Sequence, residues 1–151
     1  MNWIYIYFDI DADNFEYALD DYDTPQDILD TLTEEQKSKE INVYLQGQDD
    51  IRWTLDQVFE LKDLDEGEYI NLMLLLENWE PIANALTMYW DVISYQINSY
   101  RELAEYYIDE WLYWEVPDHL TAYIDYEKLG RDLAIDMSEA DVNWNHYYFT
   151  Y

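Results

Sequence analysis

The feature that most constrains this chain is its charge, because 35 Asp and Glu residues face only seven Lys and Arg residues. The formal net charge is −28 at pH 7, and self-repulsion of this size destabilises a compact fold. Half of the residues are nevertheless apolar and 19% are aromatic, whereas disordered acidic segments are poor in both. The 151-residue chain can therefore bury a core, and its length fits one domain or a few small lobes.

The size of this charge is comparable with that of DNA. Duplex DNA carries one negative charge per about 1.7 Å of its axis, so the 28 charges correspond to roughly 48 Å of duplex. A compact chain of this length has a radius of gyration of roughly 15 Å, hence a diameter of about 40 Å. The charge is thus consistent with a polyanion mimic as well as with a merely soluble acidic protein. Nucleic acids and anionic membranes would repel it, so we expect neither as a direct partner.

The pattern of apolar residues predicts an α+β fold with three parts. Residues 1–50 are expected to form a small acidic α/β lobe, residues 51–98 a helical lobe, and residues 99–151 a lobe of helices with a short β-hairpin. Strands are predicted at Trp3–Phe8 and Ile41–Gln46, where β-branched and aromatic residues gather.

Helix starts are marked by Thr or Ser followed three positions later by an acid or amide, as in a capping box. The three pairs are Thr24–Asp27, Thr54–Gln57 and Ser99–Glu102. We expect the first helix to continue to Lys39, where a cation suits the helix dipole. Further helices are expected over residues 65–78, 82–89, 118–123 and 125–133, residues 92–97 as a short strand or a linker, and residues 142–151 as one arm of the hairpin.

A calcium-binding loop is one candidate site. Asp9, Asp11 and Asp13 begin like an EF-hand loop, but the sixth position is Asn14 and the twelfth is Asp20, where the motif has Gly and Glu. We interpret the stretch as an acidic loop exposed to solvent.

No other motif points to catalysis. The chain has no Cys and only three Gly, which excludes thiolate metal sites and Gly-rich phosphate loops. His119 and His146 are the only histidines and are interpreted as surface or packing residues. With so many carboxylates, a close pair of acids does not indicate a site. We therefore expect no enzyme, no cofactor and no metal ion.

Acids interleaved with Tyr and Trp are suited to contact a basic groove, because these rings bury a large area at a low cost in entropy. The carboxylates expected on such a surface are Asp9, Asp11, Asp13, Glu16, Asp20, Asp21, Asp23, Asp27, Asp30, Glu34, Asp63, Asp65, Glu66, Glu102, Glu105, Asp109, Glu110, Glu115 and Asp118.

The most specific pattern lies near the C-terminus, where the chain reads YYIDEWLYWEVPDHLTAYIDYEKLGRDL. This run resembles the C-terminal region of the ArdA-type antirestriction proteins, which carry YYI-E/D, E-[VI]-P before a short helix, and YIDY-x-x-x-[GA]-RDL. The matching positions are Tyr106, Tyr107, Ile108, Glu115, Val116, Pro117, Leu120, Tyr123, Ile124, Asp125, Tyr126, Gly130, Arg131, Asp132 and Leu133. Residues 1–50 contain no matching motif.

The resemblance implies a DNA mimic from a mobile element or phage, acting in the cytoplasm of a bacterial host. It implies an elongated, acidic homodimer that occupies the DNA groove of a Type I restriction–modification enzyme. A CRISPR effector and another basic DNA-binding protein remain alternative targets. The residues that it assigns to antirestriction or assembly are Trp111, Tyr113, Trp114, Val116, Pro117, Tyr123, Asp125, Tyr126 and Arg131. We expect Arg131 to be a structural partner of neighbouring acids.

Overall fold

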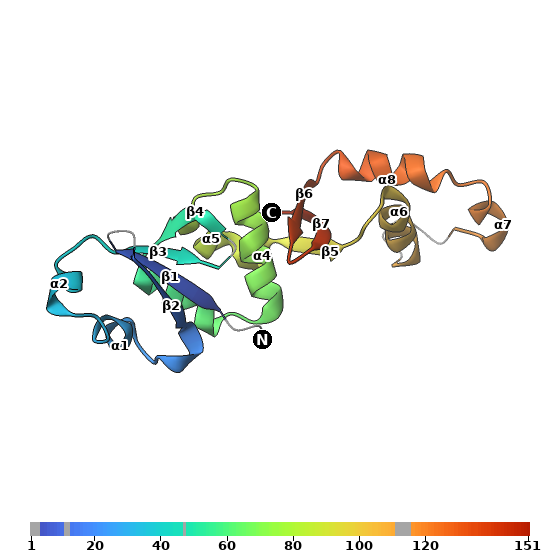
Figure 1. Ribbon diagram of the computed structural model, residues 1–151. Helices are drawn as coiled ribbons and strands as arrows, with labels where there is room; N and C mark the ends of the chain where they lie inside the picture. The colour runs from blue at the N-terminus through green and yellow to red at the C-terminus, as the bar shows by residue number, and fades with distance from the viewer. Residues whose placement is uncertain (1–3, 11–12, 47, 111–115) are drawn as a thin grey trace. The chain divides into compact units, whose positions relative to one another are not determined.

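The structure, a computed structural model, describes residues 4–10, 13–46, 48–110 and 116–151, without the side chains of Asp49 and Asp118. The described residues form eight α-helices and two antiparallel sheets (Figure 1). The predicted α+β class is therefore confirmed. The chain divides into two compact units, Met1–Gly67 and Glu68–Tyr151, which we call the N-terminal unit and the C-terminal unit. The division into three lobes stays a prediction.

The elements follow one another along the chain in this order. The N-terminal unit contains β1 (Tyr5–Ile10), β2 (Asp13–Ala18), the 3-10 helix η1 (Leu19–Asp21), α1 (Pro25–Leu29), α2 (Glu34–Lys37), β3 (Asn42–Leu45), β4 (Gln48–Trp53), α3 (Leu55–Glu60) and η2 (Leu61–Asp63). After α4 (Glu66–Glu77), which begins at the boundary, come α5 (Ile82–Met88), η3 (Tyr89–Asp91), β5 (Ile93–Gln96), α6 (Tyr100–Asp109), α7 (Asp118–Thr121), α8 (Tyr126–Ala134), β6 (Ser138–Val142) and β7 (Asn145–Thr150).

The N-terminal unit is built on a sheet with the strand order β2-β1-β3-β4. Along β1, Ile6, Phe8 and Ile10 are buried, and the residues between them are half-buried. Ile6 lies opposite Leu45 and Phe8 opposite Val43 on β3. Directly opposed residues share one face of a sheet, so these side chains form the core face. The strands predicted around residues 3–8 and 41–46 are confirmed as β1 and β3.

Two strands of this sheet are missed by the sequence pattern. The acidic stretch interpreted as a loop forms β2, which pairs with β1 from Tyr5 opposite Ala18 to Ile10 opposite Asp13. The second is β4, Gln48–Trp53, where no strand was predicted. Asp, Asn and Glu are poor strand formers, but pairing with a buried strand overrides that preference. The ring of Tyr17 on β2 also packs against Phe8, with 4.9 Å between ring centroids.

The helix starts predicted in the N-terminal unit are confirmed. Complete capping boxes are present at Thr24–Asp27 and Thr54–Gln57. The single helix expected to reach Lys39 is wrong, because α1 ends at Leu29 and a further capping box at Thr33–Gln36 starts α2. The capping residue Thr33 has extended backbone geometry. A single helix therefore cannot continue through it.

The C-terminal unit contains a sheet with the strand order β5-β7-β6, which confirms the C-terminal hairpin and settles residues 93–96 as a strand. In β7, the arm predicted at residues 142–151, the successive residues Tyr147, Tyr148 and Phe149 are all buried. Both faces of this strand are covered. Tyr148 packs in a cluster with side chains of α6 and α8, and on the opposite face Ser94 donates to Asn71 of α4 at 2.8 Å.

Helices α6 and α8 meet at very short range. Ser99 accepts from the Glu102 N–H as expected, at 3.2 Å, although the Glu102 carboxylate binds the N–H of Asn98 instead of completing the box. Gly130 on α8 is buried, and a Cβ atom at this position would lie 1.7 Å from the backbone oxygen of Tyr100. The absence of a side chain at Gly130 is therefore what lets α8 pack against the start of α6.

Candidate acidic interaction surface

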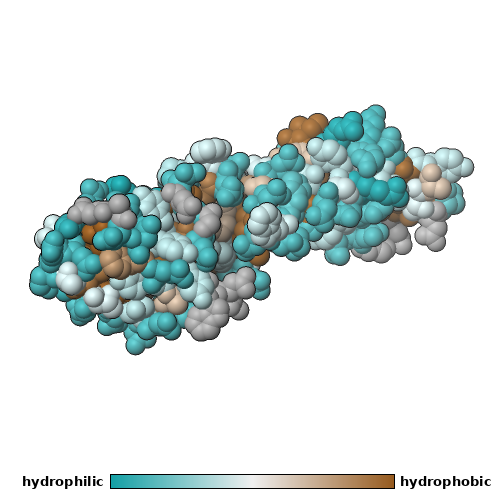
Figure 2. Space-filling model, viewed as in Figure 1, coloured by the Kyte–Doolittle hydropathy of each residue, from teal (hydrophilic) through white to brown (hydrophobic). Residues whose placement is uncertain are grey.

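The acid surplus is shared almost equally by the two units. The N-terminal unit holds nineteen acids and four bases, and the C-terminal unit sixteen acids and three bases. Among the described residues, no charged or polar residue is buried. Hydrophilic residues cover most of the visible face of each unit (Figure 2). The carboxylates are thus a property of the surface and not of an interior site.

The carboxylates predicted for this surface are found on it wherever they are described. Asp9 on β1 and Glu105 on α6 are half-buried. The exposed members are Asp13, Glu16, Asp20, Asp21, Asp23, Asp27, Asp30, Glu34, Asp63, Asp65, Glu66, Glu102, Asp109 and Glu110. Asp11, Glu115 and the side chain of Asp118 lie outside the description.

Several of the few cations are held by neighbouring acids. Lys37 lies 3.1 Å from Glu34, and Lys39 and Arg52 make further ion pairs with Glu35 and Glu40 at 3.4 and 3.0 Å. In the C-terminal unit, Arg101 contacts Glu105 at 2.8 Å. Exposed pairs of this kind add little stability. They leave most carboxylates in excess.

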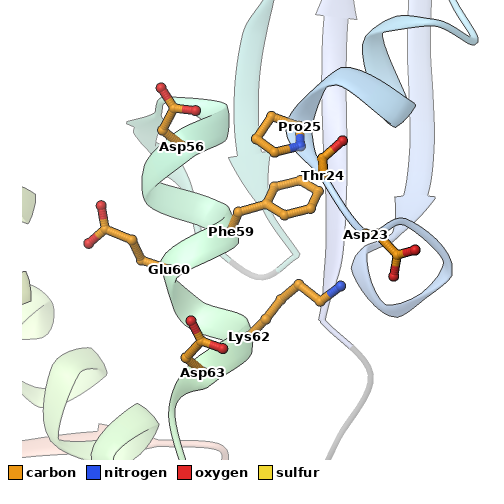
Figure 3. A pocket seen from close by; sticks show the side chains of 8 residues that line it. All are labelled: Asp23, Thr24, Pro25, Asp56, Phe59, Glu60, Lys62 and Asp63. Atoms are coloured by element: carbon orange, nitrogen blue, oxygen red, sulfur yellow. The ribbon is translucent and has the colours of Figure 1, made fainter.

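One shallow pocket of about 590 Å³ lies in the N-terminal unit (Figure 3). It is lined by Asp23, Thr24, Pro25, Asp56, Phe59, Glu60, Lys62 and Asp63. The ring of Phe59 points towards Pro25, and Lys62 donates to the backbone oxygen of Tyr22 at 2.5 Å. The Lys62 ammonium also lies 5.4 Å from the Phe59 ring centroid. The cation is therefore engaged by the protein itself, and the rim of the pocket is acidic.

An acidic stripe runs along α3 and η2, formed by Asp56, Glu60 and Asp63, which are exposed. These residues project from the side of the helix opposite the Phe59 ring (Figure 3). From the helical rise per residue, the stripe spans roughly 11 Å. Neighbouring charges of the stripe are therefore about 5.5 Å apart along the helix axis, a wider spacing than the roughly 3.4 Å along one DNA strand. The sequence prediction included Asp63 but missed Asp56 and Glu60. These two acids are four residues apart in the helix that Thr54 starts, a spacing that places them on one helix face.

Two of the predicted acids also form hydrogen bonds at helix N-termini. The side chain and backbone of Thr24 donate to the Asp27 carboxylate at 2.8 Å each, and these bonds lower the pKa of Asp27 below its ordinary value of 3.8. Asp125 accepts from the N–H of Lys128 at 3.0 Å and caps α8. These two carboxylates stabilise helix starts as well as adding charge.

The described geometry gives no support to a metal or catalytic site. Asp9 and Asp13 belong to the paired strands of a hairpin, so the calcium-loop alternative does not have the shape that it needs. Within the described ranges, no group of three His, Asp or Glu side chains is placed to hold a metal ion. His146 lies between Asp141, at 2.8 Å from Nδ1, and Glu139, at 3.8 Å from Nε2.

The residues assigned by resemblance to antirestriction or assembly lie before α7, between α7 and α8, and on α8. Trp111, Tyr113 and Trp114 fall outside the described residues. Val116 is half-buried, and Pro117 is exposed at the start of α7.

Two arginines of the C-terminal unit face tyrosine rings across the α6–α8 pair. The Arg131 guanidinium carbon lies 6.0 Å from the ring centroid of Tyr100, and that of Arg101 lies 5.5 Å from the ring of Tyr126. Tyr123, just after α7, is 85% exposed and available to a partner. The described neighbour of Arg131 is thus an aromatic ring of the adjacent helix.

Exposed large apolar side chains are a further feature of the surface, and the family resemblance includes only Tyr106, Leu120 and Tyr123 of them. All those found among the described residues belong to the C-terminal unit. They are Trp79, Trp90, Ile93, Tyr106, Leu120, Tyr123, Ile135, Trp144 and Tyr151. Two of them, Trp79 and Trp144, also have positive φ angles.

Together, the fold and surface define a small acidic α+β protein that displays carboxylates and aromatic rings outward. The family model of the antirestriction protein ArdA matches residues 2–144. The chain therefore belongs to the ArdA antirestriction family, a family of inhibitors whose partners are restriction enzymes. The match extends well beyond the C-terminal run that first pointed to it. No curated protein matches the chain, and no helix in the described part is long and apolar enough to cross a membrane.

Proposed function

We propose that this protein is a DNA mimic that inhibits a Type I restriction–modification enzyme by occupying its DNA-binding groove. The observation that carries the proposal is the distribution of acids: both units are strongly negative, and no described charged residue is buried. An enzyme typically keeps a few polar groups in an apolar pocket. A surface made of carboxylates is instead suited to a large basic partner, and we propose that the protein acts without catalysis.

The physical basis of the inhibition is competition for cations. The Lys and Arg residues of a DNA groove gain affinity by releasing counterions from the phosphates that they neutralise. Exposed carboxylates, such as Asp56, Glu60 and Asp63, engage the same cations without offering a backbone to cleave or a base to methylate. Binding of DNA and of the inhibitor then exclude each other.

The test is competition measured over a range of salt. A labelled duplex is bound to a purified Type I methyltransferase and displaced with the inhibitor, between about 50 and 500 mM salt, a span that shortens the screening length about threefold. We expect mutual exclusion and an affinity that falls steeply with salt. An affinity that stays flat over this range would refute the mechanism.

Parallel assays of restriction, modification and CRISPR cleavage identify the target. Inhibition of the Type I enzyme is the expected result. Inhibition of a CRISPR effector alone, or of another basic DNA-binding protein alone, would replace the target but keep the mimicry. We also propose that the protein is a homodimer, which light scattering at physiological salt measures directly.

A further inference from the structure

Two tryptophans of the C-terminal unit occupy backbone positions that normally belong to glycine. Trp79 and Trp144 both have a φ angle of 67°, in the left-handed region that residues with a Cβ atom rarely adopt. Their side chains are 93% and 103% exposed. Neither indole is thus held in place by packing, and neither backbone conformation is one that Trp prefers.

Trp79 ends helix α4 in a Schellman motif. Its N–H donates to the oxygen of Leu76, and the N–H of Glu80 donates to the oxygen of Leu75, both at 3.0 Å. In this motif the residue after the helix is left-handed and is usually Gly. Trp at this place leaves its indole 93% exposed, and the next residue, Glu80, accepts from the Tyr151 hydroxyl at 3.2 Å.

Trp144 is the second residue of the two-residue turn between β6 and β7. The turn is flanked by the pair Val142 and Asn145, and Asn143 also has a positive φ, of 52°. Two positive φ angles are the signature of a type I′ turn, for which Asn-Gly is the favoured sequence. In this chain Asn is followed by Trp. The tip of the hairpin therefore carries an indole at the position where Gly would be the most stable residue.

We propose that Trp79 and Trp144 are anchor residues that insert among the basic side chains of the target's groove. Trp is enriched at interface hot spots because it buries a large area at a low cost in entropy. Its ring face also binds Arg and Lys better than that of Tyr or Phe. The inference deepens the proposed function and rests on it: the carboxylates attract the target, and the indoles provide contacts that do not depend on counterion release.

Charge indicates that the occupant is a basic protein and not a second copy of this chain. Glu80 follows Trp79 directly, and Asp141 and Glu139 lie on the strand that leads to Trp144. The C-terminal unit carries thirteen more acids than bases, so another copy would bring like charge to these indoles. Lys and Arg from a DNA groove would meet carboxylates and a ring face together.

The test replaces each indole with the residue that its backbone prefers. Trp144→Gly and Trp79→Gly should leave the melting temperature unchanged or raise it by about 2–4 °C, because Gly relieves the left-handed strain. Each should weaken inhibition of the target enzyme identified above by about 10–30-fold, the effect of an interface hot spot. The loss should be the same at every salt concentration, since a neutral ring releases no counterions.

Matched variants separate the indole from the turn that holds it. Asn143→Gly changes the same turn but keeps the ring, so its inhibition should stay within about twofold of wild type, the range of an energetically neutral contact. Trp144→Phe should retain most of the affinity, whereas Trp144→Asn, which also accepts a left-handed backbone, should lose as much as Trp144→Gly. The Asn variant keeps the test valid if the Gly variant folds poorly. Binding to poly-L-lysine, which offers charge without a shaped groove, should not distinguish these variants from wild type.

Three outcomes would overturn the inference. Inhibition by Trp144→Gly and Trp79→Gly within twofold of wild type, with the steep salt dependence intact, would refute the anchors and leave the DNA mimicry standing. A change of oligomeric state in either variant would place the indoles at a contact between copies. Lack of inhibition of any enzyme in the parallel assays would refute the proposed function and the anchors with it.

Discussion

The two units carry nearly the same surplus of acid but differ in how they treat apolar side chains. In the described part of the N-terminal unit, every large apolar side chain is at least half-buried, and the surface is acidic and polar. The described part of the C-terminal unit exposes nine large apolar side chains. Even charge on both units provides attraction that is spread and screened by salt. The exposed rings described on the C-terminal unit offer short-range contacts in addition, so the two units differ in apolar contact and not in charge.

Replacing a helical glycine by alanine should change stability in opposite directions at Gly130 of α8 and Gly67 of α4. Gly130→Ala places a Cβ atom 1.7 Å from the backbone oxygen of Tyr100, and this clash should cost about 3 kcal/mol or more. Gly67→Ala meets only the Asp65 side chain, at 3.3 Å, and should stabilise α4 by about 0.5 kcal/mol. Urea unfolding measures both. Equal effects would show that the α6–α8 contact is not as close as described.

Neutralising acids tests whether both units attract the target. We compare Asp56→Asn/Glu60→Gln/Asp63→Asn in the N-terminal unit with Glu127→Gln/Asp132→Asn/Asp136→Asn in the C-terminal unit. Each triple variant should lower the slope of log affinity against log salt by about 2–3, at roughly 0.9 per neutralised contact. That is about a hundredfold loss at low salt, whereas a single substitution should cost only about fivefold, the cube root of that loss. An effect from one triple variant alone would confine the mimicry to that unit.

Helix caps provide a comparison in which the units should behave alike. Thr24→Ala in the N-terminal unit and Ser99→Ala in the C-terminal unit each remove a hydroxyl that accepts from a helix N–H. Each should lower the free energy of unfolding by about 1 kcal/mol. Thermal unfolding of the two variants measures this, and a loss in one unit only would show that the other helix is held by its packing.

Lowering the pH should remove the contribution of the Asp27 carboxylate to the stability of the fold. Its hydrogen bonds with Thr24 lower its pKa in the folded state, so the stabilisation is present above the unfolded value of about 3.9 and is lost as pH falls through the lower folded value. The difference in stability between wild type and Asp27→Asn should therefore shrink below about pH 4. A difference that stays constant down to about pH 2 would contradict the linkage.

Replacing either of two exposed arginines by alanine should give the smallest losses of stability. Arg131→Ala removes a cation from the ring of Tyr100, with an expected loss of about 0.5–1 kcal/mol. Arg52→Ala removes an exposed ion pair with Glu40 and should cost about 0.2–1 kcal/mol. We expect Arg131→Ala to affect folding or dimerisation and to leave inhibition intact. Native melting combined with lost inhibition would instead place Arg131 at the target.

Local features of this protein could be predicted because their causes are local. The capping boxes at Thr24 and Thr54 involve residues three positions apart, and β1 and β3 have the composition of buried strands. The acids are exposed because a buried carboxylate without a partner is too costly. The run that ends in Gly-Arg-Asp-Leu identified the family from a few residues. Each of these properties follows from the sequence by itself.

The rest depended on contacts between residues far apart in the chain. β2 is a strand because β1 offers it a partner, although its own composition favours a loop. Gly130 matters only because Tyr100 lies against it. Trp79 and Trp144 are exposed because a helix end and a tight turn hold them, and no sequence motif marked these two positions. Charge and caps were determined by the sequence alone, whereas strand pairing and the exposure of each ring were decided by the tertiary structure, because they depend on what packs against each residue.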